Sequence, residues 1–574
     1  MEDRSFMRSL CMGEILEDLI FPFPYLSNEK KETVRSLVNS LEAWLKDQGD
    51  NFRKWDVAGG FPSEFIEQMR QFGLFSLVVP EEFGGLGLGS AAYSRVMQCL
   101  ATFDASLAVT AGAHSSIGMR GLLLFGNDDQ RKRYLPNLAS GKMIAAFCLT
   151  EAGAGSDASG IKTKAVKSGS DWILNGEKIW ITNGGIADFF TVFARTETQA
   201  GQMSAFIVTK EMPGVSIGPH EDKMGIRASS TTTVSFENVK VPAVNLLGEE
   251  GKGFKVAMNI LNVGRTGLGG GSIGGMKRAI ELATKHANQR QQFGRPIAEF
   301  GLVKQKIGHM VVECYATEAA VGMVAGLVDN GVKDYAVEAA ISKVFASECV
   351  FRAFDEALQI AGGAGFMREY PYERALRDCR INRIFEGANE ILRLFIALTA
   401  IQDVGSSLKE VASTLGTVLS DPIKGFGVLT QYAGRRVTHA TGIGVATMTK
   451  VHPLLKPQAE IFEECSRSLA ATTDRLLRKH GKNIIGKQFA TRRLADIMID
   501  LFVLATTISR VTSSIESQGQ SGAAKEIEIA QVFAGQVQRR VRSNFSKIDQ
   551  NDDELIKSLA DHALTREKFS WDTI

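Results

Sequence analysis

Cysteine is scarce in this chain and is nowhere arranged as metal ligands or as a redox pair. The 574 residues include seven cysteines, with no C-x-x-C pair and no cysteine close to a histidine at ligand spacing. These absences favour a reducing compartment and argue against a zinc or iron–sulfur site. We therefore expect no metal, and we expect each cysteine to be a small residue of the core.

The chain also lacks an excess of charge of one sign. Its 66 lysine and arginine residues balance 64 aspartate and glutamate residues, the net charge is +2, and no long run of one sign occurs. A nucleic-acid partner is therefore not expected, because binding to a phosphate backbone needs a basic surface. Hydrophobic residues make up 44% and charged residues 23%, as in soluble globular proteins, and the length of 574 residues predicts two to four domains.

A long uncharged apolar run is missing as well. The most apolar long segment, residues 494–511, carries Asp496 and Asp500 and therefore predicts a buried bundle helix, not a membrane span. The first residues, Met1-Glu2-Asp3-Arg4, are typical of neither a secretory signal nor an arginine-rich mitochondrial presequence. They indicate either a cytosolic protein or one whose targeting residues are not in this chain.

The period of the apolar residues changes twice along the chain. Residues 29–142 have helical spacing, interrupted by a glycine-rich loop at 79–89, residues 147–247 alternate as strands do, and helical spacing returns from residue 253 onward. This order is not the alternation of a dinucleotide-binding fold. Asn175-Gly176 predicts a hairpin turn. Breaks between the later helices are predicted near Gly405, Asp421-Pro422, Gly481 and Gln518-Gly519.

Two glycine-rich segments and one tryptophan are candidates for ligand contact. Residues 269–274 match G-x-G-x-x-G, but no strand precedes them, so close helix packing is the expected role of these glycines. In residues 148–157, hydroxyls and glycine backbone suit a planar or anionic ligand, and equally a polar turn that leads into the strands. Trp180 is either a core residue or a wall against a flat cofactor.

Glu386 is a candidate for acid–base chemistry. It lies beside Gly387 and just before an apolar, helix-periodic run at residues 391–395. Such a setting is partly dry, so the pKa of the carboxyl can rise, and the glycine lets a substrate approach the backbone closely. The alternative is a salt bridge at the edge of the core.

Two long segments resemble the signatures of the acyl-CoA dehydrogenase family. Residues 148–160 match the first signature and residues 359–378 the second, in the same order along the chain. The resemblance covers nearly the whole chain and implies a mainly α fold with a β domain. Its expected parts are an N-terminal extension (1–28), an N-terminal helical domain (29–146), a middle β-barrel domain (147–252), a C-terminal four-helix bundle (253–404) and an additional helical domain (405–574).

The resemblance implies that FAD binds between the β domain and the bundle. By family position, the residues on the flavin side are Phe147, Leu149, Thr150, Gly155, Ser156, Trp180 and Thr182. Those expected to reach the FAD of a neighbouring subunit are Arg290, Phe293, Gln359 and Gly363. Oligomerisation is therefore implied by the cofactor site itself. The resemblance also places Ala388 and Glu390 among the cofactor-binding residues.

The resemblance also implies that Glu386 is the catalytic base. It would remove the α proton of an acyl-CoA thioester while a hydride leaves the β carbon for FAD, which gives the trans-2-enoyl-CoA. In a subset of the family the base acts from the position that Gly264 occupies here, and glycine cannot accept a proton. The residues expected on the substrate side are Ser156, Asn262, Arg265 and Gly387.

Two positions depart from the family pattern. Ala388 replaces the usual threonine after Glu-Gly, and Ala152 replaces a common proline. The missing threonine hydroxyl would contact FAD, so its loss is expected to weaken FAD binding by about a kcal/mol.

The chain from residue 406 onward resembles the extension of the very-long-chain acyl-CoA dehydrogenase and of the related ninth member, which also serves complex I assembly. This implies dehydrogenation of long- or very-long-chain acyl-CoA in mitochondrial β-oxidation, with electrons passed to electron-transfer flavoprotein. It also implies a homodimer attached peripherally to the inner mitochondrial membrane. Residues 424–436 are apolar with a basic end. This pattern fits either an interfacial helix on that membrane or a solvated helix of the bundle. Small residues at 108–113 suit a deep acyl channel, although helix packing also uses them.

Two other functions stay open. One is a complex I assembly factor with reduced or secondary dehydrogenase activity, and the retained Glu386 and both signatures favour catalysis over a binding role alone. The other is an acyl-CoA oxidase, which shares the fold and passes electrons to oxygen in peroxisomes. The last residues, Ser570 to Ile574, are not a peroxisomal signal, which argues against the oxidase.

Overall fold

The computed structural model describes residues 4–198, 201–417 and 447–573. The chain forms two compact units, a larger one of residues 22–391 and a smaller one of residues 5–21 and 392–574. All seven cysteines are free and buried, which confirms their predicted place in the core. Among the described residues, no group of three or more histidine, cysteine or acidic side chains could hold a metal ion.

The N-terminal part of the larger unit is helical, as predicted. Ser27 accepts a hydrogen bond from the Lys30 N–H and so caps the first long helix, and Asn127 and Gln130 form a capping box at the last. The helices are α2 (Asn28–Asp47), α3 (Asn51–Ala58), α4 (Ser63–Gln71), α5 (Ser90–Phe103), α6 (Ala105–Gly112), the π-helix η3 (Ala113–Gly118), α7 (Arg120–Phe125) and α8 (Asp128–Ala139). Ala108 and Ala111, two of the small residues assigned to an acyl channel, lie in the hydrophobic core of these helices.

An eight-stranded sheet follows and confirms the predicted β domain. Its strand order is β6-β7-β3-β2-β4-β5-β8, and β1 pairs in parallel with β4. Alternating apolar residues, including Leu174, Phe190 and Phe206, form the core of one face. The strands are β1 (Ala145–Cys148), β2 (Lys164–Ser168), β3 (Asp171–Thr182), β4 (Phe189–Thr198), β5 (Gly201–Thr209), β6 (Val215–His220), β7 (Thr231–Val241) and β8 (Leu246–Leu247).

The hairpin turn predicted at Asn175-Gly176 is wrong. β3 runs through both residues, and its register against β7 shifts between Leu174 and Gly176. Gly176 has φ +148°, and a Cβ there would lie 2.5 Å from the Thr163 hydroxyl. The Asn-Gly pair therefore forms a bulge, where glycine allows the backbone of β3 to approach Thr163.

Helices return in the bundle of the larger unit. They are α9 (Gly253–Gln289), α10 (Gly301–Asp329), α11 (Ala336–Ala361), α12 (Gly363–Phe366) and α13 (Tyr372–Cys379), and a short hairpin of β9 (Gln291–Gln292) and β10 (Arg295–Pro296) joins α9 to α10. A Cβ at Gly269 would lie 2.7 Å from Val321, and one at Gly274 would lie 2.1 Å from the Gln98 carbonyl oxygen. These glycines serve close helix packing, as predicted.

One helix in the described part of the chain, α10, is long and apolar enough to cross a membrane. Within its most apolar window, 67% of the residues are buried inside the protein, and core helices of soluble proteins pass the same test.

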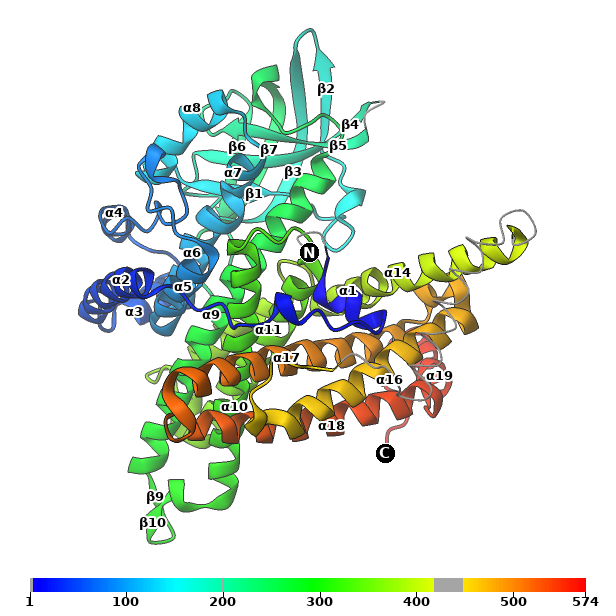
Figure 1. Ribbon diagram of the computed structural model, residues 1–574. Helices are drawn as coiled ribbons and strands as arrows, with labels where there is room; N and C mark the ends of the chain where they lie inside the picture. The colour runs from blue at the N-terminus through cyan, green and yellow to red at the C-terminus, as the bar shows by residue number, and fades with distance from the viewer. Residues whose placement is uncertain (1–3, 199–200, 418–446, 574) are drawn as a thin grey trace. The chain divides into compact units, whose positions relative to one another are not determined.

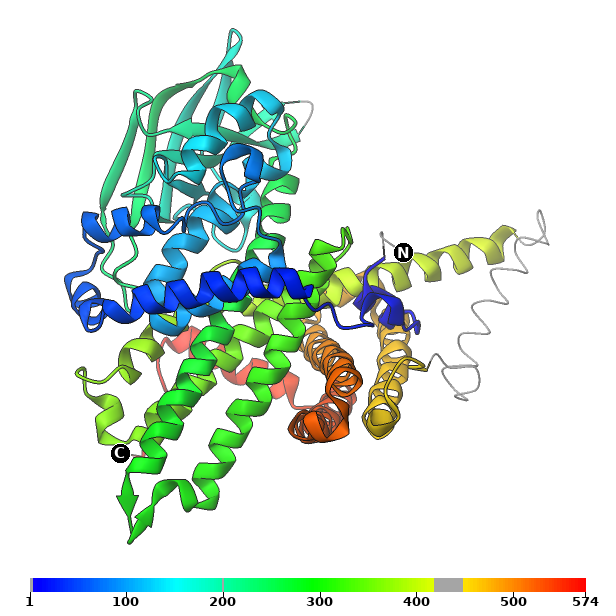
Figure 2. The same cartoon turned by 60° about the vertical axis from the view of Figure 1, so that its left-hand side comes forward.

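Figures 1 and 2 both show the sheet at one end of the larger unit and the β9–β10 hairpin at the opposite end. The two regions are joined by the long helices of the bundle. This arrangement separates residues of β3 from residues of the hairpin within one chain.

The smaller unit is helical. It contains α1 (Phe6–Cys11), most of α14 (Asn389–Thr417), α16 (Lys456–His480), α17 (Gln488–Gly522), α18 (Ala524–Asp549) and α19 (Asp553–Arg566). Residues 494–511 are mostly buried in α17, as predicted, and their two aspartates are paired, Asp496 with Arg393 and Asp500 with Arg540.

Three of the four predicted helix breaks are tested by the described residues. α16 ends before Gly481, and Gly519 has φ +73° at a kink in α17, so both breaks are confirmed. The break at Gly405 is wrong, because α14 continues through it, and a single helical glycine costs only about 1 kcal/mol. Asp421-Pro422 and the segment 424–436 lie outside the described residues.

Candidate functional site

Glu386 lies in an unusual backbone turn just before α14. Its φ is +55° and that of Gly387 is +96°, so two consecutive residues are left-handed. Glycine accepts this conformation freely, but a glutamate does so at a cost of about 1–3 kcal/mol. Such a conformation persists only where the surrounding structure enforces it, and this is common at functional sites.

The carboxyl of Glu386 points into the protein. Its Oε2 is buried and has no hydrogen-bond partner among the described residues. A Cβ on Gly264 of α9 would lie 3.3 Å from this oxygen. Burial raises the pKa of Glu386 to about 7, although the charges of Lys343 and Arg265 act in the opposite direction. A carboxyl with this pKa can exchange a proton near neutral pH.

The structure brings the predicted substrate-side residues Asn262 and Arg265 to the same place. They are three residues apart on α9, and Arg265 Nη1 donates to Asn262 Oδ1 at 2.7 Å. Arg265 is buried, which lowers its pKa to about 10, and the negative charge of Glu386 acts to raise it. The guanidinium remains charged at neutral pH and lies within electrostatic reach of the carboxyl. No ion pair of Glu386 is found among the described residues, and its Oε2 has no hydrogen-bond partner there, which argues against the core-edge salt bridge considered as its alternative.

The first signature segment is fastened to β3 by a buried ion pair. Lys178 has no exposed side-chain surface, and its Nζ donates to Glu151 Oε1 at 2.7 Å and to the Leu149 carbonyl oxygen at 3.0 Å. Glu151 also accepts from the Thr163 N–H and hydroxyl at 3.0 and 2.6 Å. Burial acts to raise the pKa of Glu151, but these hydrogen bonds and the charge of Lys178 hold it below its usual value. The backbone of residues 149–151 is thus held in place by Lys178 and Thr163.

Trp180 is not a core residue. The register of β3 against β7 shifts between Lys178 and Ile181, and Trp180 within this bulge has φ +56° and is 64% exposed. The Ile179 N–H donates to the Thr150 carbonyl oxygen at 3.0 Å, which links the bulge to the signature segment. An exposed indole next to a segment that contains Thr150 can pack against the face of a flat ligand, and the threonine offers a hydroxyl for hydrogen bonding.

The other predicted cofactor residues differ in exposure. Leu149 is buried, Phe147, Thr150, Thr182 and Ala388 are half-buried, and the exposed members are Gly155, Ser156, Arg290, Phe293, Gln359, Gly363 and Glu390. Phe293 is 91% exposed with φ +53° in the β9–β10 hairpin. Figure 1 shows this hairpin far from β3, so Phe293 and Trp180 do not meet within one chain.

Sequence reasoning missed three buried polar residues of the site. They are Lys178, Lys343 and Tyr93. Lys343 donates to the Gly387 carbonyl oxygen at 2.8 Å. Burial raises the pKa of Tyr93, and the negative charge of Glu386 acts in the same direction. The signal for Lys343 was present, because it is the only charged residue in the otherwise small and apolar stretch 339–347. A lysine there cannot easily reach solvent.

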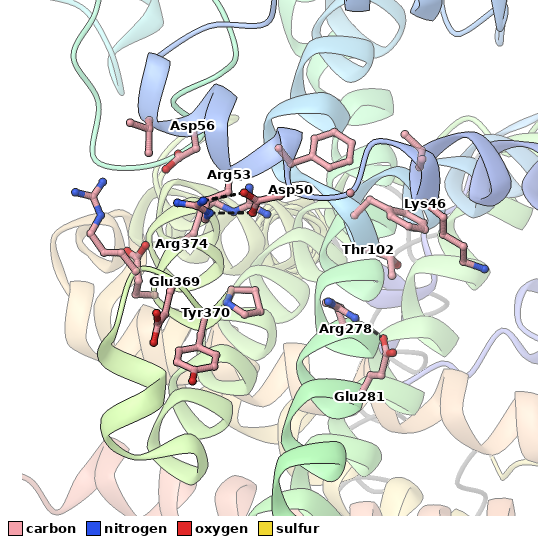
Figure 3. Close-up of a pocket in the computed structure, with 18 of the residues that line it drawn as sticks. Lys46, Asp50, Arg53, Asp56, Thr102, Arg278, Glu281, Glu369, Tyr370 and Arg374 are labelled. Carbon is pink, nitrogen blue, oxygen red and sulfur yellow. Dashed lines mark hydrogen bonds and ion pairs between the residues drawn. The ribbon is translucent and has the colours of Figure 1, made fainter.

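A separate cavity of about 810 Å³ lies in the larger unit and is lined by residues of α2, α3, α9 and α13 (Figure 3). Its charged side chains pair with one another, Arg53 with Asp50 at 2.7 Å and Arg278 with Glu281 at 2.8 Å. Glu386 is not among its lining residues. The many charges of both signs do not suit a long acyl chain.

Four segments of the chain match known domains. Residues 31–142, 146–239 and 251–401 match the N-terminal, middle and C-terminal domains of acyl-CoA dehydrogenase. Residues 453–569 match the domain described as "ACAD9/ACADV, C-terminal domain". Together these matches cover most of the chain, including the sheet, the bundle and the smaller unit.

Similar proteins agree with this assignment. The mitochondrial very-long-chain specific acyl-CoA dehydrogenase of Mus musculus is 41% identical over 559 residues, which are 95% of this chain and 84% of that protein. An acyl-CoA dehydrogenase of Bacillus anthracis, solved in complex with FAD, has a TM-score of 0.79 and 33% identity over 96% of this chain and 94% of that chain. Butyryl-CoA dehydrogenase of Megasphaera elsdenii has a TM-score of 0.63 and 36% identity, and it covers 66% of this chain and 99% of its own.

The residues present fit the cofactor that this similarity implies. Trp180 offers an exposed aromatic face, Thr182 a hydroxyl two residues later, and residues 153–155 an open glycine-containing backbone. Glu386 supplies a buried carboxyl that can accept a proton. The chain belongs to the acyl-CoA dehydrogenase family and is an FAD-dependent acyl-CoA dehydrogenase.

Proposed function

We propose that this protein oxidises long- or very-long-chain acyl-CoA to trans-2-enoyl-CoA with Glu386 as the base. The observation that carries the assignment is the buried Glu386 Oε2, which lies beside Gly264 and has no hydrogen-bond partner in the described part of the chain, in a carboxyl whose pKa burial raises to about 7. Glu386 accepts the α proton, and its own backbone N–H is a donor for the thioester oxygen as negative charge develops there. When bound, FAD supplies the acceptor for the β hydride.

Other side chains prepare the base for this step. Arg265 places a positive charge near the carboxyl and is oriented by Asn262, which would also meet the pantetheine arm of the substrate. Gly264 leaves the space beside Glu386 Oε2 free of a side chain. Lys178 and Glu151 hold the segment that would line the flavin.

The pKa of Glu386 predicts a pH dependence. The group acts as a base only when ionised, so the rate of flavin reduction by substrate should fall about tenfold per pH unit below about pH 7 and level off above it. Stopped-flow measurement of flavin bleaching by palmitoyl-CoA between pH 5 and 9 checks this. A rate that is constant through this range would contradict the assignment.

The preference for long chains is supported by the C-terminal extension. The butyryl-CoA dehydrogenase of M. elsdenii aligns over 66% of this chain, whereas the very-long-chain enzyme of the mouse aligns over 95%. We expect kcat/KM to be higher for C16-CoA than for C8-CoA. Steady-state assays with both thioesters test this, and a clear preference for C8-CoA would refute it.

A homodimer is supported by the separation of the proposed FAD residues. Trp180 belongs to β3, and Arg290 and Phe293 belong to the segment of the β9–β10 hairpin, which lies at the opposite end of the larger unit from the sheet (Figures 1 and 2). A second copy of the chain would bring its hairpin to the flavin. A mitochondrial location is proposed on the similarity to the mouse enzyme, whose name places it in mitochondria. Peripheral attachment to the inner membrane and electron transfer to electron-transfer flavoprotein are proposed on the family resemblance alone.

A second candidate function is a role in complex I assembly beside the enzymatic one. It is favoured by the match of residues 453–569 to a domain that is described for two related proteins together. Co-purification of respiratory-chain assembly proteins with the Glu386→Gln variant would separate this role from catalysis. An acyl-CoA oxidase function is the weaker alternative, and peroxide production in air would revive it.

A further inference from the structure

Lys343 of α11 is fully buried and is hydrogen-bonded to the segment that carries Glu386. Its Nζ donates to the Gly387 carbonyl oxygen at 2.8 Å and to Asn389 Oδ1 at 2.8 Å. Gly387 directly follows Glu386, so the ammonium fixes the backbone next to the proposed base. A lysine with no exposed surface is unusual, because a buried charge is costly unless it is paired and hydrogen-bonded.

Asn389 strengthens this attachment to α11. Its side chain is almost fully buried and donates from Nδ2 to Ser347 Oγ at 3.0 Å and to Glu348 Oε1 at 3.1 Å. Ser347 follows Lys343 by one helical turn. The left-handed turn is thus held to one stretch of α11 by several hydrogen bonds, which accounts for the persistence of a costly backbone conformation.

The charge of Lys343 also acts on the Glu386 carboxyl. Among the charges that lower the pKa of Glu386, that of Lys343 has the largest effect, followed by that of Arg265 on α9. Burial lowers the pKa of Lys343 to about 7, and the carboxylates of Glu386, Glu348 and Glu390 act to raise it. Burial also raises the pKa of Tyr93 on α5, and the negative charge of Glu386 acts in the same direction.

Anchoring alone would require a hydrogen-bond donor at this position, but not a charge. A neutral side chain with a donor, such as glutamine, could bond the Gly387 carbonyl oxygen without the cost of burying an ammonium group. The lysine places a positive charge near a carboxyl that must be ionised before it can accept a proton. This combination of contacts and charge favours a role in the reaction.

We propose that Lys343 is a positioning residue that holds the Glu386–Gly387 turn and supplies a positive charge that favours the ionised form of the Glu386 carboxyl. The inference rests on the proposed assignment of Glu386 as the base. It adds a residue of α11 to Gly264 and Arg265 of α9 at the base segment.

The variants Lys343→Met and Lys343→Arg test this role in the FAD-loaded full-length protein. In Lys343→Met, the acid limb of flavin bleaching by palmitoyl-CoA should move up by about one pH unit or more, because a nearby opposite charge shifts a carboxyl pKa by about one to three units. At pH 7 kcat should fall more than KM changes. Lys343→Arg should return the midpoint toward that of the wild type, and Lys525→Met, at an exposed lysine of α18, should leave it unchanged.

Infrared titration reads the same carboxyl without turnover. The protonated-carboxyl band that disappears in Glu386→Gln belongs to Glu386, and its midpoint should rise in Lys343→Met. Unchanged midpoints in both measurements, even with a lower melting temperature, would overturn the proposal. If Lys343→Met does not fold, Lys343→Gln, which keeps one donor and lacks the charge, is measured in the same way. A Glu386→Gln protein that still bleaches its flavin would instead refute the assignment of the base.

Discussion

Glu386→Gln is expected to slow substrate-driven flavin bleaching by about a thousandfold, within the range that a general base contributes. Glutamine has nearly the same shape as glutamate but cannot accept the α proton. FAD should remain bound, because the substitution leaves Trp180 and the segment bonded to Lys178 unchanged. Stopped-flow absorbance of the flavin band after addition of palmitoyl-CoA measures the rate, and the flavin-to-protein ratio reports occupancy.

Glu237→Gln is the matched control for this variant. Glu237 is an exposed glutamate of β7, and its replacement should leave the bleaching rate unchanged. If Glu386→Gln and Glu237→Gln both bleach at the wild-type rate, another group removes the proton, and the site built around Gly264 and Arg265 does not serve as the active site.

Lys178→Met is expected to have the second large effect, on stability and on FAD binding. Removal of one partner leaves Glu151 buried without its ammonium, which in other proteins costs about 3–5 kcal/mol. The Leu149 carbonyl oxygen also loses its donor. Since this segment would line the flavin, FAD binding should weaken by at least about tenfold, which is about 1.4 kcal/mol. Urea denaturation and fluorescence titration of the apoprotein with FAD measure the two effects separately.

Lys525→Met provides the control for breaking an ion pair. Lys525 pairs with Glu528 on the surface of α18 with 85% of its side chain exposed, so its loss should cost less than about 1 kcal/mol. If Lys178→Met unfolds at the same urea concentration as Lys525→Met and binds FAD as the wild type does, the ion pair does not position the flavin segment.

Much of the fold follows from local sequence patterns. The change of period from helical to alternating and back predicts the helices, the sheet and the bundle, and the packing glycines of α9 were recognised because no strand precedes them. The bulge at Asn175-Gly176 was missed because it depends on Thr163, which lies against Gly176 just before the neighbouring strand β2. A dipeptide that favours turns cannot reveal such a contact.

The candidate site was predictable where it is encoded in a contiguous motif. Glu386 and Gly387 were identified from their neighbours in the sequence, and their left-handed backbone agrees with a functional turn. The supporting residues could not be identified in this way. Lys343 precedes Gly387 by 44 residues and Lys178 follows Leu149 by 29, so only the folded chain shows what each ammonium binds.

The visible spectrum of the purified protein under anaerobic conditions, with and without palmitoyl-CoA, tests the central claim most directly. The wild type should show a flavin band that bleaches on addition of the thioester, and Glu386→Gln should show the same band without bleaching. A wild-type protein that retains its flavin band with C16-CoA, C8-CoA and shorter thioesters alike, or a Glu386→Gln variant that bleaches as fast as the wild type, would contradict the account.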